Sequence, residues 1–199
     1  MESLMQKRIL AIFFGALLFP LPSLVLAAEA DNRPLVDEAR KVASRLLTDV
    51  RAELMRELEA SGPVRAIIVC KYSAPELSGV ISREKGMRVA RVSLRPRNPM
   101  VGAADVWEQK NLLDFERRIT AGEKAESLER SEVVVEPGGR YFRYMKAIPM
   151  GQPCLACHGP AESISEAVRA KLASEYPHDN STNYRSGQLR GAVSIKKQL

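Results

Sequence analysis

The stretch E-V-V-V-E-P-G-G-R-Y-F-R-Y-M-K-A-I, residues 132–148, decides the fold class of this chain. Two runs rich in β-branched and aromatic residues, 132–136 and 140–148, flank the turn sequence Pro137-Gly138-Gly139. Two such runs around a short glycine-containing turn predict an antiparallel β-hairpin. The hairpin is therefore expected to form the centre of a small antiparallel sheet.

Helices and further strands are predicted on both sides of this hairpin. Apolar residues recur at three- or four-residue steps over 34–60, which predicts a long amphipathic helix that ends at Gly62-Pro63. The apolar run 66–70 is too short to assign between helix and strand. Other patterns predict helices at 105–120 and 163–176, strands at 87–94 and 189–195, and a loop at 95–104. We expect an α+β fold in which helices flank the sheet.

The N-terminal segment 1–30 has the pattern of a secretory signal peptide. Two basic residues precede the apolar run 9–19, and a small-residue stretch follows at 26–30. Two prolines close the apolar run after eleven residues, whereas a membrane-spanning helix needs about 20. We therefore expect cleavage of the segment, one exported periplasmic domain at 31–199, and no stable membrane span after cleavage.

The charge of the chain is basic but dispersed. The formal net charge is +6 at pH 7, and no run of basic residues or interleaved aromatic residues concentrates it into a nucleic-acid surface. We interpret the charge as a solvated face and expect no nucleic-acid partner. The predicted helix at 34–60 is a candidate homodimer or relay surface, and packing on the sheet of its own domain is at least as well supported.

Directly after the hairpin stands P-C-L-A-C-H-G, residues 153–159, which holds three of the five cysteines and histidines of the chain. In an exported protein, C-x-x-C-H is the attachment signal of a c-type haem. Two thiols three positions apart can add to the two vinyl groups of one porphyrin, and the next imidazole then lies under the iron. Cys154 and Cys157 are thus predicted to bind one covalent haem c, with His158 as the proximal iron ligand.

Other chemistries of these cysteines stay open at this point. Cys70 together with Cys154, Cys157 and His158 makes a Cys₃His zinc set. The C-x-x-C pair can also form a disulfide or a thioredoxin-like redox centre, although the βαβ pattern that accompanies the latter is absent from the sequence. Neither alternative requires a histidine next to the second cysteine, so covalent haem is the favoured interpretation.

The residues themselves do not decide the second axial ligand. In small electron-carrying cytochromes c the ligand methionine follows the haem motif, whereas all seven methionines here precede Cys154. The candidates are Cys70, His178 and these methionines. Cys70 in I-I-V-C has the ordinary interpretation of a small buried hydrophobe, and His178 that of a solvated turn residue. A free thiol left over in an exported protein nevertheless needs an explanation, and iron ligation supplies one.

Four separated motifs extend this argument. They are I-I-V-C-K-Y-S-A-P-E at 67–76, R-V-S-L-R-P-R-N-P at 91–99, Y-F-R-Y-M-K-A-I-P-M-G-Q-P-C-L-A-C-H-G at 141–159, and Y-P-H-D-N-S-T-N-Y-R-S-G-Q-L-R-G-A-V-S at 176–194. In this order they resemble a family of bacterial c-type-haem proteins with a PAS-like fold. In a cyanobacterial member of that family the iron lies between the CxxCH histidine and an upstream cysteine, which aligns with Cys70. The resemblance thus implies iron ligation by His158 and Cys70. The chain departs from it at His178 and Asn183, where relatives usually have a small or polar residue and a glycine.

The resemblance also implies a function, because PAS-like haem pockets usually belong to sensors. We expect a redox or diatomic-gas sensor with an unidentified redox or signalling partner protein. The alternative is a low-potential periplasmic electron carrier, since a thiolate ligand depresses the haem potential. We do not expect an enzyme, because no acid–base constellation is visible. Arg95, Arg97 and Tyr144 are candidate contacts of the haem propionates, with solvated surface as an equally supported interpretation.

Overall fold

A four-stranded antiparallel sheet with the strand order β1-β4-β3-β2 forms the centre of the fold. The computed structural model describes residues 32–199, so the predicted signal peptide at 1–30 lies outside the described residues. The strands are β1 (Arg88–Val92), β2 (Glu129–Glu136), β3 (Gly139–Pro149) and β4 (Leu189–Gln198). Strands β2 and β3 pair antiparallel from Glu129–Lys146 to Glu136–Gly139, so the predicted hairpin is confirmed. The α+β class is confirmed with it.

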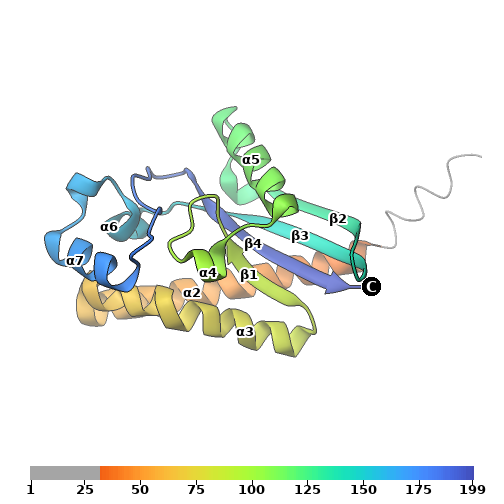
Figure 1. The fold of residues 1–199 in the computed structure, drawn as a ribbon, viewed down its shortest axis with the longest axis horizontal. Coiled ribbons are helices and arrows are strands. Elements are labelled where there is room, and N and C mark those ends of the chain that lie inside the picture. Colours follow the sequence, from red (N-terminus) through yellow and green to blue (C-terminus); the bar gives the residue numbers. More distant parts are fainter. Residues whose placement is uncertain (1–31) are drawn as a thin grey trace, which may run out of the picture. The chain divides into compact units, whose positions relative to one another are not determined.

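Helices cover both faces of the sheet (Figure 1). On one face lie α2 (Arg33–Ile68), the π-helical turn η1 (Val69–Ser73) and α3 (Ala74–Lys85), and on the other lies α5 (Val106–Thr120). Shorter elements are α4 (Pro99–Gly102), α6 (Leu155–His158), α7 (Glu166–Glu175) and the 3₁₀ turns at Ala125–Ser127, Gln152–Cys154 and Ala161–Ser163. Figure 1 shows α6 and α7 at the end of the sheet opposite the β2–β3 turn. No helix within residues 32–199 has the length and apolarity needed to cross a membrane.

Helix α2 packs its apolar stripe on the sheet of its own chain. Leu46 and Val50 are buried in a core cluster with Phe142 and Ile195 of the sheet, as the three- and four-residue spacing predicts. The helix is interrupted at Gly62, whose φ of 75° and ψ of 178° are not helical, which confirms the predicted end of the first segment. A second helical segment then continues from Pro63 through the run 66–70 that the sequence pattern left unassigned.

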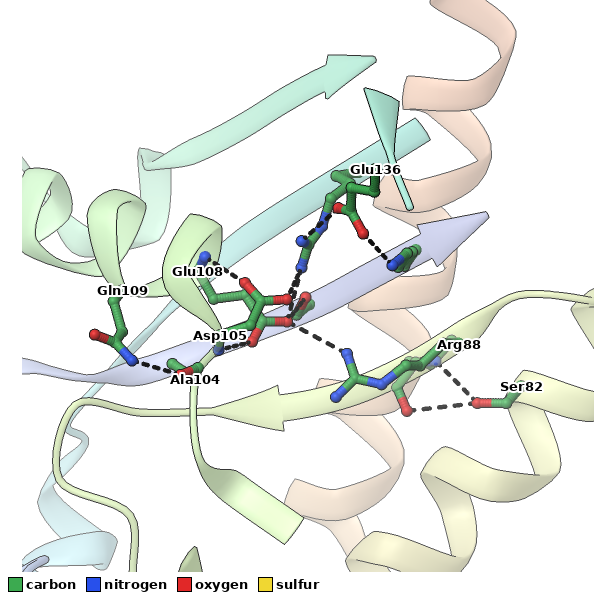
Figure 2. Close-up of polar contacts among 11 residues, drawn as sticks. Ser82, Arg88, Ala104, Asp105, Glu108, Gln109 and Glu136 are labelled. Atoms are coloured by element: carbon green, nitrogen blue, oxygen red, sulfur yellow. Dashed lines mark hydrogen bonds and ion pairs between the residues drawn. The ribbon is translucent and has the colours of Figure 1, made fainter. Parts of the chain in front are cut away.

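The opposite face of the sheet contains a buried polar network beneath α5 (Figure 2). Asp105 caps α5 in a reciprocal capping box, in which each of Asp105 and Glu108 accepts a hydrogen bond from the other's backbone N–H. Glu108 and Arg143 are only 1 % and 2 % exposed, and their side chains pair at 3.2 Å. Arg143 also bonds Asp105 and Glu136. The network thus joins the start of α5 to β2 and β3.

A third apolar cluster lies where the second segment of α2 meets α7. Ile67 packs there with Val168, Leu172 and Tyr176, and Cys157 packs against the cluster. This contact brings the segment before Cys70 beside the C-x-x-C-H motif, although the two are far apart in the sequence.

Candidate functional site

A large cavity of about 890 Å³ lies between α2 and the sheet. Its walls are mostly apolar: Leu54, Leu58 and Ile67 come from α2, and Val89 and Ile148 come from the sheet. At one end it is closed by the segment Gly151–His158 and by Tyr176. A cavity of this size and composition is typical of a site for a bulky cofactor.

All four predicted cysteine and histidine site residues line this cavity: Cys70, Cys154, Cys157 and His158. The cysteines are free thiols, so the structure contains no disulfide between them. Burial raises the pKa of the Cys157 thiol. Within residues 32–199, no group of three or more His, Cys, Asp and Glu side chains is arranged to hold a metal ion, so the Cys₃His zinc alternative has no support.

The contacts of His158 determine which ring nitrogen carries the proton and which keeps its lone pair. Its Nδ1 lies 2.6 Å from the backbone carbonyl oxygen of Ser181. Because a carbonyl oxygen only accepts, Nδ1 donates the proton of the neutral ring, and Nε2 keeps its lone pair. Burial and the charges of Arg190 and Arg97 hold the pKa of His158 well below its usual value. His158 is therefore a neutral imidazole that is prepared for metal ligation through Nε2.

Arg97 connects the C-x-x-C-H segment to the loop at 179–181 through hydrogen bonds and an ion pair. Its Nη2 donates to the carbonyl oxygens of Cys157 at 2.5 Å and Ser181 at 3.1 Å. Its Nε lies 3.0 Å from the Asp179 carboxylate, at an ion-pair distance without hydrogen-bond geometry. Asp179 in turn accepts from the backbone N–H of Ser181 at 2.7 Å. These contacts fix the carbonyl that orients His158, so Arg97 is a positioning residue of the site.

The loop 181–184 runs along the end of the motif and restrains it further. The backbone N–H groups of Asn183 and Tyr184 donate to the carbonyls of Gly159 and His158, both at 2.9 Å. Asn183 has a φ of 61°, in the left-handed region that glycine and asparagine tolerate best. The departure from the glycine of its relatives is thus compatible with the backbone at this position.

Cys70 stands on the π-helical turn η1, between the kink at Gly62 and helix α3. Single π-helical turns are rare and are often found at functional sites. The next residue, Lys71, forms a hydrogen-bonded ion pair with Glu175 at the end of α7. The hydrogen bonds of Lys171 and Lys71 lower the pKa of Glu175 to about 2. The turn with Cys70 is thereby attached to the helix that follows the C-x-x-C-H motif.

Three other predicted residues do not line the cavity. Tyr144 is fully buried in the α2 side of the core, and its hydroxyl donates to Glu129 at 2.9 Å, so its contact with a propionate stays a prediction that this position does not favour. Arg95 lies over the Tyr184 ring and donates to the carbonyl of Thr182. His178 is exposed on the surface. Of the predicted site residues with charge, only Arg97 lines the cavity.

Sequence analysis missed several residues of the cavity. Arg91 and Arg190 line it, as do Met55 and Met150. The alternation of β1 was a usable signal for Arg91, since Val89 two residues earlier lies on the same face and is buried. No comparable signal existed for Arg190, whose orientation depends on an irregularity of β4.

Residues 28–197 match the Tll0287-like family. The chain belongs to this family. A crystal structure of the cyanobacterial haem protein Tll0287 is similar in fold, with a TM-score of 0.62 and 21 % sequence identity over 84 % of this chain and 96 % of that one. No curated protein matches the sequence. The match covers the cavity and every candidate residue of this Tll0287-like protein.

Proposed function

We propose that this Tll0287-like protein is an exported periplasmic protein that binds one haem c. Cys154 and Cys157 attach the porphyrin covalently, and His158 and Cys70 are the axial ligands of the iron. The protein senses redox state or a diatomic gas and passes the signal to a partner protein. We assign it no catalytic reaction.

One observation supports this proposal above all others: Cys70, Cys154, Cys157 and His158 line the same cavity. The thiol pair has the spacing of haem attachment. The Nε2 of His158 is free to bind a metal, because Nδ1 donates to Ser181. Cys70 is the remaining thiol in the cavity, and thiolates are known axial ligands of haem.

The dimensions of the cavity also support haem. Its volume of about 890 Å³ lies within the range of about 300–1,000 Å³ that ligand and cofactor sites occupy. The walls from α2 and the sheet are mostly apolar, as a porphyrin requires. The structurally similar Tll0287 is itself described as a haem protein. A bound haem would supply a one-electron redox centre and an iron position that can take a gas ligand.

The two proposed ligands differ in how firmly the chain holds them. His158 is restrained by the Ser181 carbonyl and by the flanking Cys157, which Arg97 bonds. Cys70 lies on a π-helical turn that follows the kink at Gly62, and elements of this kind often act as hinges. Cys70 is therefore the ligand whose displacement we propose as the sensing event. The polar contacts of this turn with α7 include the Lys71–Glu175 ion pair.

The first experiment tests attachment and ligation. The chain is expressed with a cytochrome c maturation system, denatured and stained for haem, and we expect a stained band that the Cys154→Ser/Cys157→Ser variant lacks. In Cys70→Ala the thiolate features of the ferric absorption spectrum should vanish, while His178→Ala, a surface control, should keep them. An unchanged Cys70→Ala spectrum together with an altered Met55→Leu or Met150→Leu spectrum would contradict ligation by Cys70.

The second experiment separates a sensor from the alternative, a low-potential electron carrier. Carbon monoxide is added to the reduced protein, and the spectrum is compared with that of Cys70→Ala. A sensor in which Cys70 is displaced should form an adduct in both proteins. Reversible one-electron cycling with no adduct in the wild type would favour the electron carrier and refute displacement.

A further inference from the structure

Cationic side chains are abundant in the cavity, but their partners differ. The cationic lining residues are Arg51, Lys71, Arg91, Arg97, Lys146 and Arg190, whereas Glu126 is the acidic one. Arg97 is committed to Asp179 and to two carbonyls, and Lys71 to Glu175. Arg91 and Arg190 have neither an ion pair nor a side-chain hydrogen bond with any residue from 32 to 199. Arg51 has no such partner within the described residues either, but it is exposed on α2. Arg91 and Arg190 are thus the two guanidinium groups of the sheet that line the cavity without an anion from residues 32–199.

An irregularity of the sheet brings Arg190 to this position. In the β3–β4 pairing Ile148 faces Gly191 and Pro149 faces Leu189, so Arg190 is the extra residue of a β-bulge. Strict alternation would place it with Ala192 on the α5 face. The bulge instead packs Leu189 in the α5-side cluster with Ala192 and leaves Arg190 to line the cavity. Bulges that redirect a side chain are frequent next to functional sites.

The neighbouring strand stabilises this bulge. Ser93, which follows β1, donates from Oγ to the carbonyl oxygen of Arg190 at 2.9 Å. Gly191, the next residue, has a φ of 157°, and a Cβ there would lie 2.3 Å from the carbonyl oxygen of Val92. Only glycine allows β1 and β4 to approach so closely at this point. The chain thus holds Arg190 in place through its backbone rather than through a salt bridge.

Arg91 reaches the same cavity from β1. Arg91 lies two residues after Val89 and therefore on the same face of β1, the face toward α2. It pairs with Val193 of β4, which is buried on that face. The pKa of Arg190 is lowered, mainly by burial and in part by the nearby positive charge of Arg91. A guanidinium placed in this way is stabilised when a carboxylate enters, because its planar fork can donate two parallel hydrogen bonds.

We propose that Arg91 and Arg190 form a carboxylate subsite that binds the two propionates of the porphyrin. This inference rests on the proposed function, and it replaces the predicted contacts of Arg95 and Tyr144. Arg97 belongs to the support of His158 instead. The subsite would fix which edge of the porphyrin lies against β1 and β4.

The test uses the mature protein and the variants Arg91→Gln and Arg190→Gln, with Arg185→Gln as an exposed control from the preceding loop. Loss of a positive charge beside the propionates disfavours uptake of an electron, so both variants should have a lower midpoint potential than wild type. The propionate bending band in the resonance Raman spectrum should shift as well, because a hydrogen bond to the carboxylate is lost. Arg185→Gln should leave both readouts unchanged.

A second pair of variants distinguishes charge from the geometry of the contact. Arg91→Lys and Arg190→Lys keep the charge but not the planar fork, so they should recover the potential while the Raman band stays shifted. They also supply the readout if either glutamine variant fails to mature. Unchanged potential and Raman band in both arginine positions would overturn the subsite and leave haem binding intact. A wild type without stained haem would overturn both proposals.

Discussion

Replacement of Glu108 by glutamine should strongly destabilise the fold while leaving the cavity intact. Glu108 is 1 % exposed, and its Oε1 accepts hydrogen bonds from Arg88 at 3.3 Å, Arg143 at 3.2 Å and Ser194 at 2.6 Å. Its Oε2 accepts from the backbone N–H of Asp105 at 2.8 Å. The network, part of which is drawn in Figure 2, lies on the face of the sheet opposite α2.

The expected magnitude follows from these four contacts. Glutamine has the same shape, but one carboxylate oxygen is replaced by an NH₂ group, which cannot accept a hydrogen bond. The NH₂ group must face either the donors at Oε1 or the Asp105 N–H, so at least one of these donors loses its acceptor. Removal of the charge also takes from Arg143, 2 % exposed, its most buried anionic partner. Arg143 keeps Asp105 and Glu136 as partners, so the cost is that of an unsatisfied buried donor, about 1–3 kcal/mol. This is a substantial part of the roughly 5–15 kcal/mol by which domains are stable.

The free energy of unfolding is measured by urea denaturation, followed by far-ultraviolet circular dichroism. Asp114→Asn on the same helix is the control, because the Asp114–Arg117 pair is exposed and such pairs contribute about 0.2–0.5 kcal/mol. The double variant Glu108→Gln/Arg143→Met should lose less than the sum of the two single variants, because the two side chains contact each other directly and their effects are therefore coupled. A loss below about 1 kcal/mol for Glu108→Gln would refute the reasoning.

Two further predictions concern stability. Gly191→Ala should destabilise the protein by about 1–3 kcal/mol in the same urea assay, because its Cβ would lie 2.3 Å from the Val92 carbonyl oxygen; a wild-type midpoint would contradict this. Burial opposes ionisation of Asp105, yet its hydrogen bond with Arg143 holds the pKa of that carboxyl below 3.8, and the Lys196 contact lowers the pKa of Glu136 below 4.5. The stabilisation from these carboxylates is therefore present above pH 4.5 and lost as the pH falls below those values. Arg143→Met should show a flatter loss of stability between pH 5 and 3, and an equally steep loss in the variant would count against the assignment.

The elements that local patterns determine could be predicted from the sequence. The Pro137-Gly138-Gly139 turn and the apolar periodicities of 34–60 and 105–120 all act within a few residues, and each element is found where it was expected. Helix α3 at Ala74–Lys85 was not assigned. The run 66–70 became helical because the segment after Gly62 buries Ile67 against α7, a contact that no local pattern contains.

The candidate site likewise has a part that local sequence predicts and a part that depends on long-range packing. Cys154, Cys157 and His158 were predictable because their spacing is itself the chemical signal. The surroundings of His158 were not, since Ser181, Asp179 and Arg97 meet it only through long-range packing. Arg97 was predicted as a propionate contact, but in the structure its guanidinium group contacts the backbone carbonyls of Cys157 and Ser181 and the carboxylate of Asp179.

Cys70 shows why a motif alone cannot place a ligand. Its neighbours in I-I-V-C predict a buried thiol, the leftover cysteine made iron ligation one of several candidates, and the resemblance then favoured Cys70. In the structure two long-range contacts bring it to the cavity: Ile67 packs on α7, and Lys71 pairs with Glu175 at the end of the same helix. Because these two contacts lie on either side of Cys70 in sequence, its position depends on α7, and α7 follows the C-x-x-C-H motif in the chain. A displacement of Cys70 would therefore strain the contacts with α7 and the kink at Gly62 together, and under the proposed function this strain would carry the signal from the cavity into the long helix α2.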